Sequence, residues 1–323
     1  MCSRPEVQAL DNNVVSLKGR LQLTAAERLV WCLVPKVGTT YIKYQLKWEI
    51  DAWQKLSSKT SDVKFSEHHR KSFVFIREPY SRLLSAYMDK ILTTPTWWPR
   101  KGAQIMKLAG TIQNDTAWFT KCAVHATFAD FIRYFIVSEK TGKGRDLHFI
   151  PMHDQCGLCN KRYDFLGHLE TFSEDLDFIL SSVNISVEIK PQQETIMQRK
   201  AIEALDEGKI QINKCTDNYT VMKRLWFSFQ ARGFLPDSLE MPLGVEASLN
   251  MTGDKFGKAL VKSWLDNKGS FDSKHQKLNI LRQMYQQIQL EDRLKLMKIL
   301  EKDFLMFKYD PQPPEVFPEF SSV

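Results

Sequence analysis

The stretch LVWCLVPKVGTTYIKYQL (residues 29–46) joins an apolar run to a polar turn and then to a helical pattern. Residues 29–34 are apolar throughout, which is typical of a strand buried on both faces of a parallel sheet. Beyond the turn, apolar side chains recur at helical spacing, at Ile42, Leu46, Ile50 and Trp53. The sequence therefore predicts a buried strand, a turn, and a helix that begins near Thr39 and runs to about residue 57.

A second stretch, KSFVFIREPYSRLLSAYMDKIL (residues 71–92), repeats this arrangement. Residues 73–76 form a short apolar run, and Pro79 suits the first turn of a helix because its missing N–H is not needed there. The apolar face of that helix is expected at Leu83, Leu84, Tyr87, Met88 and Ile91. Two strand–turn–helix units in succession predict an α/β fold with a central parallel sheet flanked by helices.

Composition and charge narrow the class of protein. The chain has 323 residues, 43% hydrophobic and 26% charged, as in a soluble globular protein. Its net charge of +7 suits an anionic ligand. Because RNA-binding signatures and zinc-finger spacing are absent, we expect no nucleic-acid partner. No apolar run reaches about 18 residues, so we expect no membrane span; the oligomeric state stays open.

The domain organisation follows from where periodic patterns begin and end. Residues 1–27 are expected to be a flexible lead-in, 28–310 a single domain, and the proline-rich 311–323 a tail. Within the domain we expect a surface loop at 93–104, a helix at 128–137, a turn at 141–146, a strand at 163–167, a helix opened by a capping box of Thr171 and Glu174, and one broken helix or two at 278–307.

The turn of the first unit, Pro-Lys-Val-Gly-Thr-Thr, is suited to an anion. A helix that begins near Thr39 presents unpaired N–H groups and the positive end of its dipole. Gly38 allows close approach of the backbone, Lys36 adds a charge, and Thr39 and Thr40 add hydroxyl groups. The Gly-Lys-Ser/Thr of the Walker loop is absent. The alternative is an ordinary capped strand-to-helix turn.

The turn of the second unit carries Arg77 at the end of a strand and Ser85 in the following helix. A guanidinium and a hydroxyl suit a second phosphate group at the carboxyl edge of the sheet. Alternatively, Arg77 pairs with Glu78 or Asp89, and Ser85 is a small packing residue. Two such turns in neighbouring units together favour a nucleotide with two separated phosphate groups.

These motifs resemble the Golgi carbohydrate sulfotransferases of the group that includes the chondroitin and dermatan 4-O-sulfotransferases and the HNK-1 sulfotransferase. CLVPKVGTT (32–40) is similar to their 5'-phosphosulfate loop, and FVFIREPYSRLLSAYMDK (73–90) to their 3'-phosphate motif. HFIP (148–151), CGLC (156–159), YDFLG (163–167) and DFLMFKY (303–309) resemble later blocks. The resemblance spans roughly residues 29–310, with departures from the family pattern at Phe149, at Leu158 and at Thr39–Thr40–Tyr41.

The resemblance implies a P-loop-like sulfotransferase fold and 3'-phosphoadenosine 5'-phosphosulfate (PAPS) as co-substrate, with no metal required. It implies that Arg77 and Ser85 hold the 3'-phosphate, and that Lys36 lies beside the bridging oxygen that leaves with the donor. The 5'-phosphosulfate is expected in the loop of Lys36, Val37, Gly38, Thr39 and Thr40. The acceptor is expected to be a glycan or proteoglycan, of the chondroitin/dermatan type, in the Golgi lumen.

A general base must take the proton of the acceptor hydroxyl. His148 is the first candidate because it matches a histidine of the family. His68 and His69 precede the strand of Arg77 and are alternatives. A carboxylate such as Glu170 is a further alternative if burial raises its pKa.

Cysteines and sequons bear on the compartment. Four sequons, at Asn114, Asn184, Asn218 and Asn250, favour the secretory pathway. His153, Cys156 and Cys159 supply three ligands of a zinc site without a fourth, so disulfides are preferred. The pairing stays open among Cys122, Cys156, Cys159 and Cys215.

Two other classes of function remain as alternatives to the enzyme. One is an inactive glycan-binding protein on the same fold; the presence of Lys36, Arg77 and Ser85 disfavours it. The other is a nucleotide kinase, which the missing Walker motif disfavours. For the enzyme, Trp97 and Trp98 in the proline-rich loop suit stacking on the sugar rings of the acceptor; the alternative is that they only pack.

Overall fold

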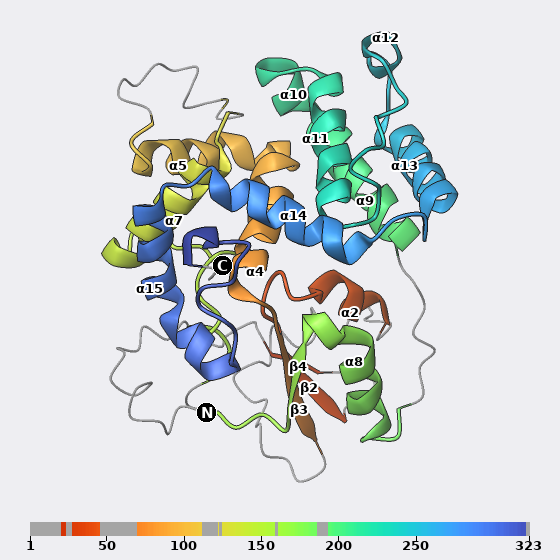
Figure 1. Ribbon diagram of the computed structural model, residues 1–323. Coiled ribbons are helices and arrows are strands. Elements are labelled where there is room, and N and C mark those ends of the chain that lie inside the picture. Colours follow the sequence, from red (N-terminus) through yellow and green to blue (C-terminus); the bar gives the residue numbers. More distant parts are fainter. Residues whose placement is uncertain are drawn as a thin grey trace. The chain divides into compact units, whose positions relative to one another are not determined.

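The computed structural model describes residues 21–23, 28–45, 70–111, 122, 125–158, 161–185 and 193–320 (Figure 1). The chain packs as two compact units. Unit 1 comprises residues 1–82, 146–191 and 298–311, and unit 2 comprises residues 83–145, 192–297 and 312–323. The domain boundaries predicted from the sequence stay a prediction.

Unit 1 is built on a sheet with the strand order β1-β2-β3-β4. The strands are β1 (Leu21–Leu23), β2 (Leu29–Cys32), β3 (Lys71–Ile76) and β4 (Phe165–His168). Strands β2, β3 and β4 are parallel, whereas β1 adds an antiparallel edge. The predicted parallel sheet is therefore confirmed, although β4 begins at Phe165 and not at the expected residue 163.

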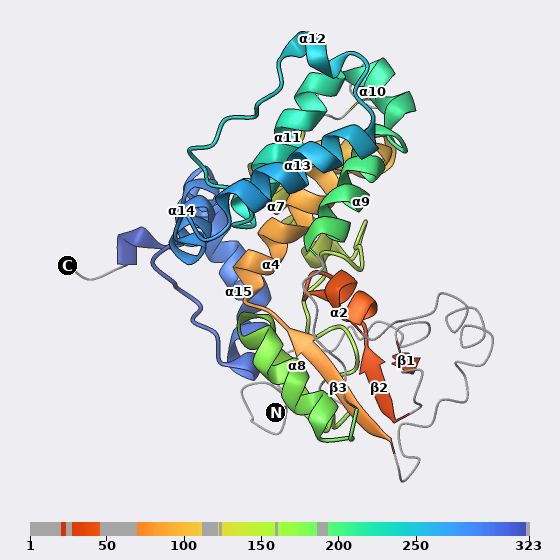
Figure 2. The same ribbon diagram turned by 90° about the vertical axis from the view of Figure 1, so that its right-hand side faces the viewer.

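The core of unit 1 explains the continuous apolar runs. All residues of β2 and all residues of β3 after Lys71 are buried, because side chains on both faces of the sheet are covered. The covering helices are α2 (Thr39–Gln45), α8 (Phe172–Ser181) and the last turns of α15 (Leu290–Phe307). Figure 2 shows α8 beside the strands. Helix α2 begins at the predicted residue, and the rest of its predicted length lies outside the described residues.

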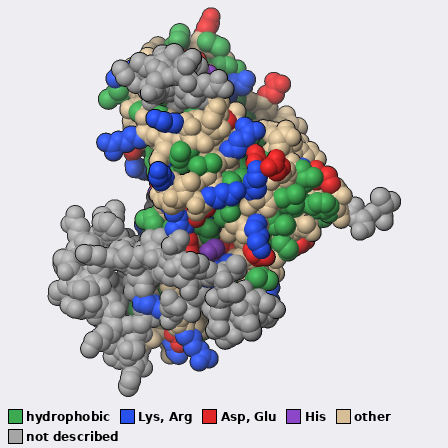
Figure 3. Space-filling view, turned by 90° about the vertical axis from the view of Figure 1, so that its left-hand side faces the viewer, with side chains coloured by type: hydrophobic (Ala, Val, Ile, Leu, Met, Phe, Trp, Pro, Cys, Tyr) green, Lys and Arg blue, Asp and Glu red, His purple; other side chains and the backbone are tan. Residues whose placement is uncertain are grey.

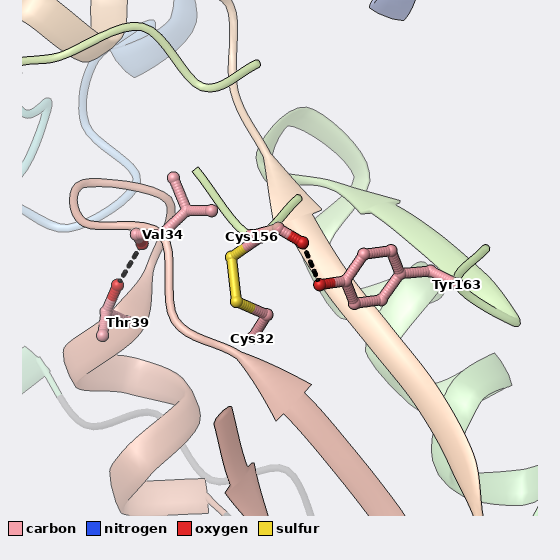
Figure 4. The surroundings of a disulfide bond; sticks show 5 residues. All are labelled: Cys32, Val34, Thr39, Cys156 and Tyr163. Carbon is pink, nitrogen blue, oxygen red and sulfur yellow. Dashed lines mark hydrogen bonds between the residues drawn. A yellow bond between two sulfur atoms is a disulfide. The ribbon is translucent and has the colours of Figure 1, made fainter. Parts of the chain in front are cut away.

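A disulfide within this core joins Cys32, the last residue of β2, to Cys156, with an S–S distance of 2.07 Å (Figure 4). The Tyr163 hydroxyl donates a hydrogen bond to the carbonyl oxygen of Cys156 over 2.5 Å. The expected partners of Cys156 are thus wrong. Sequence spacing pointed to nearby thiols, but the fold brings together two cysteines that are 124 residues apart. Cys159 lies outside the described residues.

Unit 2 is helical within the described residues. Its α-helices are α5 (Ala103–Leu108), α7 (Phe128–Thr141), α9 (Gln193–Leu205), α10 (Lys209–Cys215), α11 (Asn218–Ala231), α12 (Val245–Ser248), α13 (Gly253–Asn267), α14 (Ser273–Gln286) and the first part of α15. Helices α9 and α13 pack side by side (Figure 1). A Cβ at Gly257 would lie 2.9 Å from the Gln198 Cα, so glycine permits this close approach. A second disulfide joins Cys122 to Cys215, one of the pairings left open above.

The predicted surface loop at residues 93–104 is wrong. Helix α4 (Pro79–Ala86) continues into the short helical turn η1 (Tyr87–Leu92); after Thr93 and Thr94, η2 (Pro95–Trp97) and η3 (Trp98–Gly102) follow. Trp98 is fully buried, and its Nε1 donates to the carbonyl oxygen of Ile91 over 2.8 Å. Because its indole fills the core of unit 2 and its N–H is satisfied, Trp98 does not stack on a sugar. The helix at 128–137 and two C-terminal helices, α14 and α15, are confirmed.

Candidate functional site

The β2–α2 turn (residues 33–38) is fixed at both ends by hydrogen bonds. The Thr39 hydroxyl donates back to the carbonyl oxygen of Val34 over 2.8 Å (Figure 4). The N–H of Ile42 donates to the carbonyl oxygen of Gly38 over 3.0 Å. Between these bonds, Lys36 and Gly38 have φ angles of 73° and 83°. A left-handed lysine is strained, and such strain concentrates where a backbone is shaped for a ligand.

Two physical reasons, backbone conformation and close packing, require glycine at position 38. Its positive φ suits glycine, and an added Cβ would lie 2.9 Å from Leu169 Cδ1 and 3.2 Å from Phe172 Cε2. The turn therefore packs tightly against η4 (Leu169–Thr171) and the start of α8. Val37 is fully buried, so only its backbone is suited to contact a ligand, whereas Thr40 is exposed.

Two arginines from the β3–α4 segment hold the carbonyl groups of this turn. Arg77 Nη1 donates to the carbonyl oxygen of Lys36 over 3.3 Å, and Arg82 Nε donates to that of Pro35 over 3.0 Å. Sequence reasoning selected Arg77 as a phosphate ligand and missed Arg82. A second arginine five residues further along the same motif was the available signal. The two turns therefore form one bonded structure in unit 1.

Glu78 is the N-cap of α4. Its carboxylate oxygens accept hydrogen bonds from the N–H groups of Tyr80 (2.8 Å) and Ser81 (2.6 Å), which have no partner inside the helix. Burial raises the pKa of Glu78, against the opposing effect of these hydrogen bonds and of the Arg77 charge. The β3–α4 turn thus contains a carboxyl group whose ionised form is disfavoured by desolvation.

Glu170 ties this turn to the C-terminal end of unit 1. Its carboxylate accepts hydrogen bonds from the Glu78 N–H and from the Tyr309 hydroxyl, both over 2.9 Å. Burial, followed by the Glu170 charge, raises the pKa of Tyr309, so this hydroxyl remains protonated and donating. Glu170 itself is exposed. The burial that the alternative base required is therefore absent.

His148, the first candidate base, is paired with Asp146. Its Nδ1 lies 2.8 Å from Asp146 Oδ1, and the same carboxylate accepts the His148 N–H over 3.0 Å. With the proton on Nδ1, the Asp146 carboxylate accepts a hydrogen bond from the imidazole and fixes the orientation of the ring. The His148 side chain is partly exposed. His68 and His69 lie outside the described residues.

His153 and Cys156 have other partners than a metal. His153 Nδ1 lies 2.8 Å from Asp303 Oδ1, and Asp303 also accepts the N–H groups of Met152 and His153. Burial opposes ionisation of Asp303, but the His153 charge and these hydrogen bonds outweigh burial and lower the pKa of Asp303. Because the Cys156 sulfur is bonded to Cys32, the zinc alternative at these residues is wrong.

On the face drawn in Figure 3, charged side chains of the described residues are dispersed. In Figure 3, Lys and Arg side chains are spread over the described part of one face, and several lie beside Asp or Glu. Ser85, the second predicted 3'-phosphate ligand, is partly buried on α4. Among the helices of the described ranges, none combines the length and apolar character that crossing a bilayer requires.

Comparison with known proteins adds a family to this geometry. Carbohydrate sulfotransferase 14 of Danio rerio is 27% identical over 186 residues, which cover 52% of this chain and 49% of that protein. Carbohydrate sulfotransferase 14 of Homo sapiens is 27% identical over 174 residues, which cover 48% of this chain and 44% of that protein. Carbohydrate sulfotransferase 10 of Danio rerio is 25% identical over 222 residues, which cover 58% of this chain and 59% of that protein.

The chain spans about half the length of these curated relatives. No solved structure matches it. A sequence model of the sulfotransferase family matches residues 21–224, which include both the β2–α2 turn and the β3–α4 turn. Because this match covers more than half of the chain, the chain belongs to the sulfotransferase family.

Proposed function

We propose that this protein transfers the sulfuryl group of PAPS to a hydroxyl group of a glycan. The observation that carries the proposal is the β2–α2 turn, which places the left-handed Lys36 and Gly38 at the carboxyl edge of a parallel sheet. The curated relatives are carbohydrate sulfotransferases by name, which supports a carbohydrate acceptor.

The proposed donor site divides between the two turns. In the β2–α2 turn, Lys36, the backbone at Val37 and Gly38, and the residues Thr39 and Thr40 at the start of α2 bind the 5'-phosphosulfate. In the β3–α4 segment, Arg77 and Ser85 bind the 3'-phosphate. The tight seat of Gly38 against Leu169 supports a turn whose backbone is shaped for close approach.

The proposed reaction is an in-line displacement at sulfur. The acceptor oxygen forms a bond to sulfur while the bond from sulfur to the bridging oxygen breaks, and adenosine 3',5'-bisphosphate leaves. Negative charge develops on the bridging oxygen, where Lys36 stabilises it. His148 Nε2 takes the proton of the acceptor, and Asp146 stabilises the imidazolium that forms. No metal is required in this scheme.

The proposed acceptor is a glycosaminoglycan of the chondroitin/dermatan type, on a proteoglycan. A net charge of +7 favours an acidic glycan over a neutral one. Because basic side chains are dispersed on the face in Figure 3, the proposal depends on the turns more than on a surface patch.

The proposed location is the Golgi lumen. Two disulfides suit an oxidising compartment. Of the sequon asparagines, Asn184 and Asn250 are exposed, as glycan attachment requires, whereas the Asn218 amide donates to the Ser248 carbonyl oxygen over 3.0 Å. Protein from secretory cells should lose mass on treatment with an N-glycosidase. Unchanged mobility would contradict this location.

The decisive test is transfer of labelled sulfate. Purified protein is incubated with sulfur-labelled PAPS and desulfated chondroitin, dermatan, heparan or N-glycan, in the presence of a chelator. Labelled chondroitin or dermatan is the expected result. Glycan binding without transfer would indicate an inactive binding protein, and phosphate transfer from ATP that depends on magnesium would indicate a kinase.

A second test concerns the donor site alone. Adenosine 3',5'-bisphosphate at 100 times its Kd should stabilise the protein by about 2.7 kcal/mol, through binding to the native state only. A melting temperature that does not change with nucleotide concentration would show that both turns are wrongly assigned.

A further inference from the structure

Arg82 in unit 1 is buried, which is unusual for an arginine: only 2% of its surface is exposed to solvent. Its Nε donates to the carbonyl oxygen of Pro35 over 3.0 Å, and its Nη1 donates to that of Ile150 over 2.9 Å. Longer contacts of 3.5 Å reach the carbonyl oxygens of Phe149 and His148. One guanidinium thus contacts two backbone segments, residues 35 and 148–150, that are far apart in the sequence.

The chemistry of the guanidinium explains why arginine suits this place. Its donors are fixed in one plane, so two segments bonded to it are held at a defined separation. Burying its charge is costly unless its N–H groups are satisfied, and carbonyl oxygens supply partners with partial negative charge. Lysine would bring a single charged nitrogen, which cannot span the same two segments in a fixed geometry.

Each of the two segments leads directly to a residue of the proposed reaction. Pro35 precedes Lys36, whose own carbonyl oxygen is bonded to Arg77. His148 carries the imidazole that Asp146 orients. Because Arg82 bonds to both segments, it limits how far the backbone of Lys36 can move relative to the backbone of His148.

We infer that Arg82 is a positioning residue that sets the separation between the Lys36 ammonium and the His148 imidazole. This inference rests on the proposed function for the roles of Lys36 and His148. Arg82 itself touches neither donor nor acceptor; it acts through the backbone carbonyl groups that it holds. In-line transfer requires that Lys36 stabilises the leaving oxygen while His148 takes the proton of the acceptor. Misplacement of such a group by about 1 Å can cost on the order of 100-fold in rate.

The first test is kinetic. Arg82→Lys should lower kcat by about 10- to 100-fold while the KM for PAPS changes by no more than about threefold, since the displaced groups serve the transition state. The double variant Arg82→Lys/Lys36→Ala should lose less activity than the product of the two single losses, because Arg82 acts through Lys36. Multiplicative losses would overturn the inference.

A matched control exists in unit 2. Arg293 is also buried and donates to the carbonyl oxygens of Ile288 and Val316, while pairing with Glu319. Arg293→Lys should lower the melting temperature as Arg82→Lys does, but leave kcat per folded molecule unchanged. If both variants lower kcat equally, Arg82 has only a general structural role.

The second test needs no activity. Amide hydrogen exchange of wild-type protein and of Arg82→Lys is followed by mass spectrometry in peptides covering 33–38 and 146–152. Both peptides should lose protection together in Arg82→Lys, and neither should change in Arg293→Lys. If Arg82→Lys does not fold, Arg82→Gln replaces it, because its amide reaches only one segment.

Loss of protection in one peptide alone, or in neither, overturns the inference. A wild-type protein that transfers no sulfate overturns the proposed function. In that case the exchange experiment still tests whether Arg82 holds residues 33–38 and 146–152 together, because it requires no activity.

Discussion

The β2–α2 turn and the β3–α4 turn follow neighbouring parallel strands, yet they are held in different ways. The first has two left-handed residues, Lys36 and Gly38, and its carbonyl groups accept hydrogen bonds from outside the turn. The second is short, caps its own helix with Glu78, and supplies Arg77 as a donor. The first turn is strained and is held by donors from elsewhere in the chain; the second turn caps its own helix, is anchored by the bond from the Glu78 N–H to Glu170, and supplies Arg77 as a donor.

This difference indicates that the two turns have different roles. A strained turn persists only when surrounding groups hold it. The shape of the β2–α2 turn therefore depends on residues more than 40 positions later in the chain. We expect changes in the first turn to affect the reaction most, and changes in the second turn to affect nucleotide affinity or local stability.

The largest expected effect is at Lys36. Lys36→Ala and Lys36→Gly should each lower kcat by about 100- to 1,000-fold, because both remove the charge that stabilises the leaving oxygen in the proposed reaction. Sulfate transfer at saturating PAPS measures this loss. The two variants should differ in stability by about 1 kcal/mol in favour of glycine, since the φ of 73° is unfavourable for alanine. Recovery of activity in the glycine variant alone would show that backbone shape, and not charge, is decisive.

The next effect is steric. Gly38→Ala should destabilise the protein by about 2–4 kcal/mol, since a left-handed alanine and contact with Leu169 add together. Gly142→Ala is the matched control: Gly142 also has a positive φ, 69°, but an added Cβ meets nothing within 4 Å. Its cost should be about 1 kcal/mol, and urea unfolding measures both. Equal costs would show that the packing of the first turn is not tight.

The third effect separates two roles of Arg77. If Arg77 binds the 3'-phosphate, Arg77→Ala should weaken binding of adenosine 3',5'-bisphosphate by about 10- to 150-fold and leave AMP, which lacks that phosphate, unchanged. Titration calorimetry with both nucleotides measures this. Ser85→Ala should act in the same direction but less, because its hydrogen bond is neutral.

A control for loss of charge is Arg133→Ala, which removes a partly exposed arginine paired with Asp292 in unit 2. It should change neither affinity. If Arg77→Ala weakens both nucleotides equally, Arg77 serves only to hold the Lys36 carbonyl group, and the second turn has no ligand of its own.

The smallest effect is at Glu78. Glu78→Ala should cost about 0.5–2 kcal/mol through loss of the N-cap, and Glu78→Asp should retain most of that energy. Because burial raises the pKa of Glu78, the folded protein holds this proton more tightly than the unfolded chain does. Stability should therefore fall as pH rises from about 4, the unfolded value, through the folded pKa.

Glu78→Gln removes this titration. The melting temperature of wild-type protein minus that of Glu78→Gln should be greatest near pH 4 and should decrease as pH rises. A difference that stays constant with pH would indicate that the Glu78 carboxyl group is not desolvated, and that the second turn is solvated in the manner of an ordinary surface cap.

Local signals predicted the elements well. The apolar runs before both turns, the start of α2 at Thr39 and the start of α4 at Pro79 all depend on interactions within a few residues. The same reasoning was wrong at two places, at Thr171 because a neighbouring carboxylate competes and at Trp98 because of non-local packing. Thr171 does not form the expected capping box with Glu174; its hydroxyl donates to Asp175, which also accepts the His168 N–H. The prolines and polar residues around Trp98 predict a loop, yet Trp98 fills the core of unit 2.

The sequence by itself determined the two strand–turn–helix units, the parallel sheet and the motifs that place the chain in its family, because apolar period, glycine and proline act locally. Only the tertiary structure decided that Cys32 bonds to Cys156, that Asp146 orients His148, and that Arg82 joins the Pro35 and Ile150 carbonyl groups. These contacts depend on how segments pack after the chain has folded, and a buried donor bonds to whichever carbonyl group the packing brings within reach.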